Sequence, residues 1–279
     1  MKWIATTNEL ELFVSQIAQE SFVAIDTEFL RETTYWPVLG LIQLATPSAS
    51  ALIDPCAPGL ALDTFFELMQ RSDIVKVFHA AYQDIEIIYH LSGRLPRTIF
   101  DTQIAAMVLG YGESVSYEQL VAKLLKINLD KSLQYTNWLH RPLSERQKEY
   151  ALADVTYLCD VYLNIKKQLQ KAQREEWIKE EMALLTEESL YKKAPEQAYK
   201  RIKGRFKPLE FLIVKKLAAW RESHAQTKNL ARRRVLKDEV ILEVASQKPK
   251  TEKEFLNLRS VRHPSQNKYC AEILQLVRE

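Results

Sequence analysis

Four acidic side chains stand at positions where the surrounding sequence is apolar. In the segment FVAIDTEF (22–29), Asp26 and Glu28 are two residues apart, so a strand carries both on one face, about 6.6 Å apart. Both faces of this segment are apolar up to the acids, which predicts a strand covered on both sides. Unpaired carboxylates in such a place are costly, and the spacing therefore indicates a cation site.

Two predicted helices supply further acids of the same kind. In the helix expected over 80–91, Asp84 interrupts an apolar stripe with helical spacing. In a longer helix expected over 145–169, Asp154 interrupts another stripe, and Tyr150 lies one turn before it. No Lys or Arg is equally placed to neutralise these acids. The residues that we expect to bind metal are Asp26, Glu28, Asp84 and Asp154.

A ligand set made only of carboxylates suits hard divalent cations, so we expect two ions, Mg²⁺ or Mn²⁺. Two such ions about 3.5–4 Å apart activate a water and stabilise the leaving oxygen in phosphodiester hydrolysis. Tyr150 is placed to hydrogen-bond the attacking water or the scissile phosphate. The sequence has no Walker-type loop and no dinucleotide fingerprint, and we expect no nucleotide cofactor.

Each position also has an ordinary structural alternative. Asp26 and Glu28 fit a turn or cap, Asp84 fits a helix start, and Tyr150 with Asp154 fits the edge of a core. The joint pattern favours the metal site. His79 ends a predicted strand five residues before Asp84 and is either a hydrogen-bonded core histidine or a contact to phosphate.

The order of the predicted elements places these residues in an α/β domain. Short apolar runs at 22–29, 41–46 and 51–54 form a meander, and the connection of about four residues between the last two requires an antiparallel hairpin. Strands at 74–79 and 98–100 then alternate with helices, one of which Asp101 is expected to cap. This pattern predicts a mixed five-stranded sheet flanked by helices.

The charge distribution divides the chain into two parts. Residues 200–279 contain 20 basic and 9 acidic side chains, whereas the preceding residues have an excess of 8 acidic ones. We expect an α/β domain at 1–170, a helical connector at 171–205 and an all-helical domain at 206–279. The basic domain indicates a nucleic-acid partner, although a solvated Lys-rich bundle is the alternative. The residues expected to contact phosphates at a helix start are Arg232, Arg233 and Arg234.

Composition excludes several classes of protein. No run of about 18 apolar residues is present, and the N-terminal segment has no signal-peptide pattern, so no membrane association is expected. The three cysteines are far apart in the sequence, which suits a reducing compartment. We expect a soluble cytoplasmic protein.

Three segments resemble the exonuclease motifs of the ribonuclease D family, in the DEDDy branch of the DnaQ-like 3′→5′ exonucleases. They are DTEFLRETTYWPVLGLIQL (26–44), FHAAYQD (78–84) and RPLSERQKEYALADVTYL (141–158). The resemblance implies a ribonuclease H-like fold, with Tyr150 as the catalytic tyrosine and the four acids as metal ligands. Residues 229–249 are similar to the core of the HRDC domain, a helical nucleic-acid-binding module.

The resemblance also implies an activity and a substrate. We expect a 3′→5′ exoribonuclease that releases nucleoside 5′-monophosphates from RNA with a free 3′ end, such as tRNA precursors and small structured RNAs. Two alternatives stay open. One is a DNA 3′→5′ exonuclease of the related helicase-linked branch, and the other is a non-catalytic RNA-binding scaffold.

Overall fold

A computed structural model describes residues 1–130, 132–261 and 268–278 and divides the chain into two units. The first unit contains residues 1–30 and 38–191, and the second contains residues 31–37 and 192–279. The second unit therefore includes a short segment from the N-terminal part of the chain.

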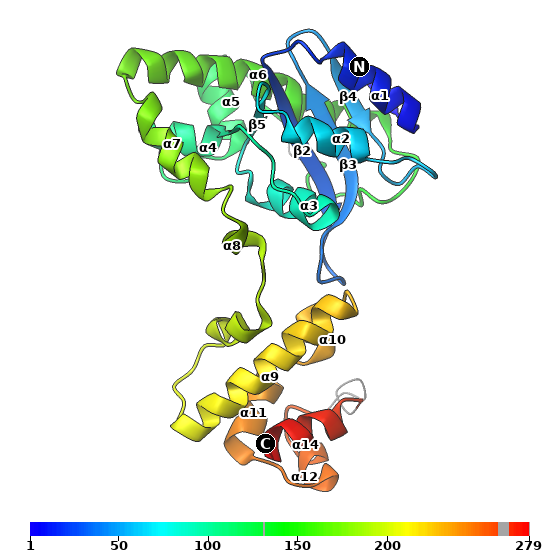
Figure 1. Ribbon diagram of the computed structural model, residues 1–279, viewed down its shortest axis with the longest axis vertical. Coiled ribbons are helices and arrows are strands. Elements are labelled where there is room, and N and C mark those ends of the chain that lie inside the picture. The colour runs from blue at the N-terminus through cyan, green and yellow to red at the C-terminus, as the bar shows by residue number, and fades with distance from the viewer. Residues whose placement is uncertain (131, 262–267, 279) are drawn as a thin grey trace. The chain divides into compact units, whose positions relative to one another are not determined.

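The first unit is built on a mixed sheet of six strands in the order β1–β4–β3–β2–β5–β6 (Figure 1). The strands are β1 (Lys2–Ile4), β2 (Phe22–Leu30), β3 (Val38–Ala45), β4 (Ser50–Ile53), β5 (Val75–Phe78) and β6 (Ile99–Asp101). β3 is antiparallel to both β2 and β4, and the other neighbours are parallel. The predicted mixed sheet and hairpin are confirmed. The strand beyond the predicted five is β1, whose three residues are too few to show an alternating pattern.

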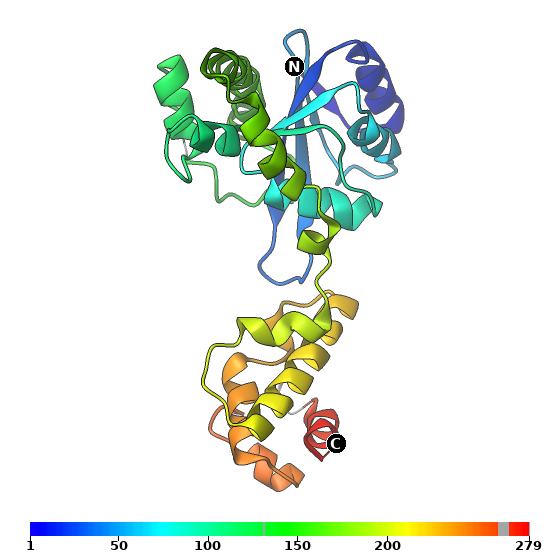
Figure 2. The same ribbon diagram turned by 60° about the vertical axis from the view of Figure 1, so that its left-hand side comes forward.

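Helices cover both faces of this sheet (Figures 1 and 2). On one face they are α1 (Thr7–Gln16), α2 (Asp63–Gln70) and α3 (Tyr82–Ser92), and on the other α4 (Thr102–Val108), α5 (Tyr117–Leu125), α6 (Glu145–Ala172) and α7 (Glu175–Leu184). In β2, Val23 and Ile25 pack with the first group, and Phe22 and Ala24 pack with the second. Since side chains alternate along a strand, Asp26 continues the face covered by the second group.

The longest helix, α6, begins at a capping box. The Ser144 hydroxyl accepts a hydrogen bond from the Gln147 amide at 3.3 Å, and the Gln147 side chain accepts one from the Ser144 amide at 3.0 Å. This box fixes the first turn of the helix that carries Tyr150 and Asp154. None of the helices described in the structure is both long and apolar enough to cross a membrane.

The second unit is helical. Its elements are a 3₁₀ helix η1 (Pro195–Arg201) and the α-helices α9 (Pro208–Thr227), α10 (Arg232–Val235), α11 (Asp238–Gln247), α12 (Glu252–Leu256) and α14 (Cys270–Arg278). Leu217 of α9, Val244 of α11, Phe255 of α12 and Ile273 of α14 are fully buried in one core. Tyr35, from the segment 31–37, is buried in the same core.

The structure does not keep residues 171–205 as a separate connector. Ile178 and Met182 of α7 pack into one core of the first unit, and Tyr191, at the end of α8 (Glu188–Tyr191), packs into the other. Ala198 and Ile202 pack into the core of the second unit. The expected boundaries at 170 and 206 differ from those of the structure because these apolar side chains attach the segment to the two cores.

Gly40 of β3 lies where a larger residue would collide with the main chain. A Cβ at this position would be 2.8 Å from the carbonyl oxygen of Trp138. We expect Gly40→Ala to lower the free energy of unfolding by about 1–3 kcal/mol, the usual range for overpacking. Thermal and urea unfolding of the purified proteins would measure this loss. Val38→Ala, at the exposed start of the same strand, serves as a control and should cost less than half as much.

Candidate metal centre

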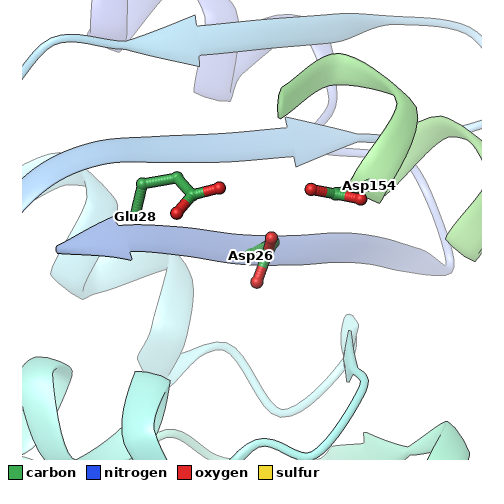
Figure 3. A group of neighbouring side chains, drawn as sticks. All are labelled: Asp26, Glu28 and Asp154. Atoms are coloured by element: carbon green, nitrogen blue, oxygen red, sulfur yellow. The ribbon is translucent and has the colours of Figure 1, made fainter. Parts of the chain in front are cut away.

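Three of the four predicted acids face one another. Asp26 and Glu28 lie on β2, and Asp154 lies on α6, which covers that face of the strand. One carboxylate oxygen of each lies within 4.8 Å of the others (Figure 3). The structure therefore brings these side chains, which are up to 128 residues apart in the sequence, into a single oxygen-rich group.

The fourth acid, Asp84, lies beside this group but outside it. It is buried in the first turn of α3 and accepts a hydrogen bond from the Thr27 hydroxyl. Thr27 stands between Asp26 and Glu28 on β2 and points to the other face of the strand. The negative charge of Asp26 contributes to the raised pKa of Asp84, after the larger effect of burial. The role of Asp84 as a metal ligand stays a prediction.

The environment of the acids opposes their negative charge. Burial raises the pKa of Asp26 to about 6 and that of Asp154 to about 8. The pKa of Glu28 rises to about 10 through burial and then through the charges of Asp26, Asp154 and Asp84. In the described part of the chain, no lysine or arginine forms an ion pair with any of them.

The side chain of Tyr150 lies next to this group, with its hydroxyl near Asp154 and its ring against Trp138. The hydroxyl lies near the carboxylate of Asp154, four residues later on α6. Burial and the neighbouring carboxylates raise the pKa of Tyr150, so the phenol is protonated and able to donate at neutral pH. Its ring packs against the buried indole of Trp138, with 5.9 Å between the ring centroids.

A cavity of about 160 Å³ opens onto two of the three acids, Asp26 and Asp154. Its lining includes Asp26, Asp154, Tyr117, Leu129, Gln134 and Tyr150. Tyr117, which sequence reasoning did not select, is fixed by a hydrogen bond from its hydroxyl to the Ala153 carbonyl at 3.2 Å. The cavity gives a second molecule access to the carboxylates of Asp26 and Asp154.

His79 also lines this cavity, but both of its ring nitrogens lie within hydrogen-bond distance of other protein atoms. Nδ1 lies 2.9 Å from the Thr102 hydroxyl, and Nε2 lies 3.1 Å from the Val115 carbonyl oxygen. The structure therefore gives His79 the hydrogen bonds of a core histidine, and its contact with phosphate stays a prediction.

Asp101 caps α4 as expected, since its carboxylate accepts a hydrogen bond from the Gln103 amide at 2.7 Å. It also accepts hydrogen bonds from the amides of Ala80 and Ala81 at 3.1 and 2.8 Å. These two residues lead directly into the first turn of α3. The same side chain thus helps to place Asp84.

Gln43 is a polar neighbour that sequence reasoning missed. In the β2–β3 ladder it stands directly opposite Asp26, and therefore on the same face of the sheet. It is fully buried, and its amide nitrogen and oxygen have no hydrogen-bond partner among the described residues. The sequence contained a signal for Gln43, because this residue interrupts the apolar run LGLIQLA (39–45) in the same way that the acids interrupt their apolar segments.

The residues present fit a divalent cation. Three oxygen donors converge within 4.8 Å, no lysine or arginine of the described residues is paired with them, and a cavity gives access to Asp26 and Asp154. Hard divalent ions select such donors. Asp26, Glu28 and Asp154 are thus able to hold a divalent ion.

Comparisons with known proteins agree with this geometry. The family model described as a 3′-5′ exonuclease matches residues 1–170, and the one described as the HRDC domain matches residues 210–277. Ribonuclease D of Nitrobacter hamburgensis is 45% identical over 262 residues, which cover 94% of this chain and 69% of the relative. This chain belongs to the ribonuclease D family. The resemblance inferred from the three motifs is confirmed.

Two further members of the ribonuclease D family support the assignment. Ribonuclease D of Bartonella henselae is 50% identical, over 94% of this chain and 64% of the relative. The crystal structure of Escherichia coli RNase D matches with a TM-score of 0.91 and 31% identity, over 99% of this chain and 74% of the other. The chain thus spans about two thirds of the length of these curated relatives.

The three predicted phosphate-binding arginines of this ribonuclease D family member differ in their surroundings. Arg233 and Arg234 are exposed on α10. Arg232 is half-buried, and its guanidinium binds Glu222 at 2.5 and 2.6 Å. Of the three, Arg233 and Arg234 therefore have side chains accessible to a ligand, and their contact with phosphate stays a prediction.

The raised pKa values predict a pH-dependent stability that divalent ions should reverse. Folded acids with raised pKa values hold protons that the unfolded chain releases at lower pH, so the metal-free protein should lose stability as pH rises from about 4 to about 8. Saturating Mn²⁺ replaces the protons, and at about 100 times its dissociation constant it stabilises by about 2.7 kcal/mol. Calorimetric unfolding with EDTA or Mn²⁺ would measure both effects.

The double variant Asp26→Asn/Asp154→Asn is the control for this experiment. It removes two of the titrating carboxylates and two of the oxygen donors, so its unfolding temperature should depend less on pH and should not respond to Mn²⁺. An equal response to Mn²⁺ in the variant and the wild type would show that the ions bind elsewhere.

Proposed function

We propose that this chain is a 3′→5′ exoribonuclease that hydrolyses phosphodiester bonds with two divalent ions and releases nucleoside 5′-monophosphates. The observation that carries the proposal is the group formed by Asp26, Glu28 and Asp154, with Tyr150 beside it, in a member of the ribonuclease D family. Carboxylates that have no cationic partner among the described residues, two of which line a cavity, fit metal-assisted hydrolysis better than a scaffold role.

In this reaction the protein supplies ligands and a hydrogen-bond donor. Divalent ions, Mg²⁺ or Mn²⁺, would activate water and stabilise the charge on the scissile phosphate and the leaving oxygen. Asp26, Glu28 and Asp154 would hold them, with Asp84 as the predicted fourth ligand. The protonated Tyr150 hydroxyl would orient the attacking water or a phosphate oxygen. Water is the only co-reactant, so no nucleotide cofactor is required.

The proposed substrate is RNA with a free 3′ end. Escherichia coli RNase D is described as an exoribonuclease involved in structured RNA processing, and it is 31% identical to this chain. We propose the same class here, with tRNA precursors and small structured RNAs as members. The excess of basic side chains in residues 200–279 suits such a polyanion. The three cysteines are far apart in the sequence, which suits a reducing compartment, and we propose a cytoplasmic location.

Replacing one metal ligand should abolish nucleotide release while the fold remains. With Mg²⁺ and a 5′-labelled RNA that has a single-stranded 3′ extension, the wild type should produce a ladder that shortens by one nucleotide at a time. Asp26→Asn should lower the rate roughly 100-fold or more, since the loss of even a group that only orients a metal ligand costs about 10–100-fold. Tyr150→Phe keeps the ring and should lower kcat without changing Mn²⁺ affinity.

Asp63→Asn, an exposed acid at the start of α2, is the matched control and should retain wild-type activity. A DNA of the same sequence tests the alternative substrate. Full activity of Asp26→Asn would refute the metal assignment, and preference for the DNA would refute the assignment to RNA.

The exposed arginines of α10 should contribute to RNA affinity in a salt-dependent way. Each phosphate contact to a single strand contributes about 0.7 to the slope of log affinity against log salt concentration. Arg233→Ala/Arg234→Ala should therefore reduce that slope by about 1.4 in fluorescence-anisotropy titrations. Lys253→Ala, an exposed charge on α12, is the control and should leave the slope unchanged. An unchanged slope in the double variant would mean that these arginines are only solvated.

A further inference from the structure

The loop between β2 and β3 belongs to the second unit. Leu30 ends the strand that carries Asp26 and Glu28, and Val38 begins the next strand, but residues 31–37 between them are part of the helical unit. The chain thus runs from the metal centre into the helical unit and returns after seven residues.

Tyr35 is the centre of a buried polar network in that unit. Its ring lies in the core among apolar side chains of the helices, with an exposed fraction of 2%. Its hydroxyl donates to Glu222 and accepts from Gln226 Nε2 at 3.1 Å and Arg232 Nη2 at 2.9 Å. The Tyr35 hydroxyl therefore makes one donated and two accepted hydrogen bonds, all within the helical unit.

Glu222 holds this network together as a buried charge. Arg232 binds it through Nε and Nη2, and Arg201 binds it at 3.1 Å. Burial alone would raise the pKa of Glu222, but the hydrogen bonds from Arg232 and Tyr35 outweigh it and hold the pKa below its ordinary value. The Arg232 guanidinium also lies over the Tyr35 ring, 4.5 Å from its centroid. Removing one partner from such a network is costly because the others stay buried.

The main chain of the loop is bound as well. Asn229 accepts hydrogen bonds from the amides of Tyr35 and Trp36 at 3.1 and 2.9 Å, and the Ala231 amide donates to the Thr33 carbonyl at 3.0 Å. Asn229 has a φ of +47°, a left-handed conformation that asparagine tolerates better than most residues. The loop is thus recognised through its backbone and through one side chain.

The ladder between β2 and β3 is irregular close to the metal centre. Glu28 pairs with Leu41 and Phe29 with Leu39, so Gly40 of β3 is the extra residue, and only Phe29 and Leu30 pair with β3 beyond it. A bulge of this kind bends a strand and redirects its side chains. Glu28 is therefore the last residue of β2 paired before the irregularity, and only Phe29 and Leu30 separate it from the loop.

We propose that Glu222, Asn229 and Arg232 form a docking site for the loop 31–37, and that this docking sets the position of Glu28 for metal binding. Tyr35 is then a positioning residue, which acts on the centre through the end of β2. In this arrangement Arg232 serves the protein interior rather than RNA. The inference rests on the proposed metal-dependent function, but its first test is metal binding, which needs no RNA.

Mn²⁺ binding to the full chain, followed by the electron paramagnetic resonance of free Mn²⁺, tests the proposal directly. Tyr35→Phe and Asn229→Ala should each weaken Mn²⁺ binding roughly 5- to 10-fold, within the usual range of coupling between sites. Hydrogen exchange should increase in residues 26–30. In RNA assays kcat should fall at limiting Mn²⁺ and recover at high Mn²⁺, while KM for RNA stays within about twofold.

Two further variants separate positioning from general stability. Asp238→Asn breaks the ion pair with Arg221 in the same unit, at 2.5 Å, and makes no contact with the loop, so Mn²⁺ affinity should not change. Asn229→Asp keeps the accepting oxygen and should restore the affinity lost in Asn229→Ala. Because Asn229 variants leave the Tyr35 hydroxyl network intact, they remain informative if Tyr35→Phe does not fold.

Wild-type Mn²⁺ affinity in both Tyr35→Phe and Asn229→Ala would overturn the proposal and leave the loop as a packing element only. Equal weakening in Asp238→Asn would also overturn it, because the effect would then be one of overall stability. Wild-type protein that binds Mn²⁺ at Asp26 and Glu28 but does not degrade RNA would instead refute the proposed function and leave the docking result standing.

Discussion

Mutual repulsion among partly buried carboxylates is the constraint around which the first unit is organised. Asp26, Glu28 and Asp154 are kept close together in surroundings that raise their pKa values, without a lysine or arginine bound to them in the described residues. Holding these carboxylates together costs free energy, and the rest of the fold must offset that cost. The two apolar layers over the sheet, assembled from α1–α3 and α4–α7, provide that energy by removing apolar surface from water.

The same constraint explains why the acids come from rigid elements. Asp26 and Glu28 lie on a central strand, and Asp154 lies on a helix whose start is fixed by the capping box at Ser144. Tyr150 shares that helix and is supported by Trp138, whose main chain in turn approaches Gly40 too closely for any larger residue there. Several polar side chains bind a metal ion well only if rigid elements hold each of them in the required position.

The sequence predicted the elements and the acid group because both depend on local periodicity. Asp26 and Asp154 were found as acids within apolar patterns, and Tyr150 by its place one turn before Asp154; the same criterion applied to amides would also have selected Gln43. It did not show that Thr27 binds Asp84, or that Arg232 turns inward to Glu222, because these contacts depend on tertiary geometry. The sequence also did not predict that residues 31–37 pack in the second unit, since the contact between Tyr35 and Glu222 joins residues that are 187 positions apart.

That separation has a consequence for the chain as it is synthesised. Residues 31–37 leave the ribosome long before the helices that receive them, and at about 5–20 residues per second a gap of 187 residues corresponds to roughly 10–40 s. During that interval the sheet is able to pack against the helices of the first unit, but the helices on which the loop 31–37 docks have not yet been synthesised. If docking sets the position of Glu28, the metal centre reaches its final geometry only after the helices of the second unit have been synthesised.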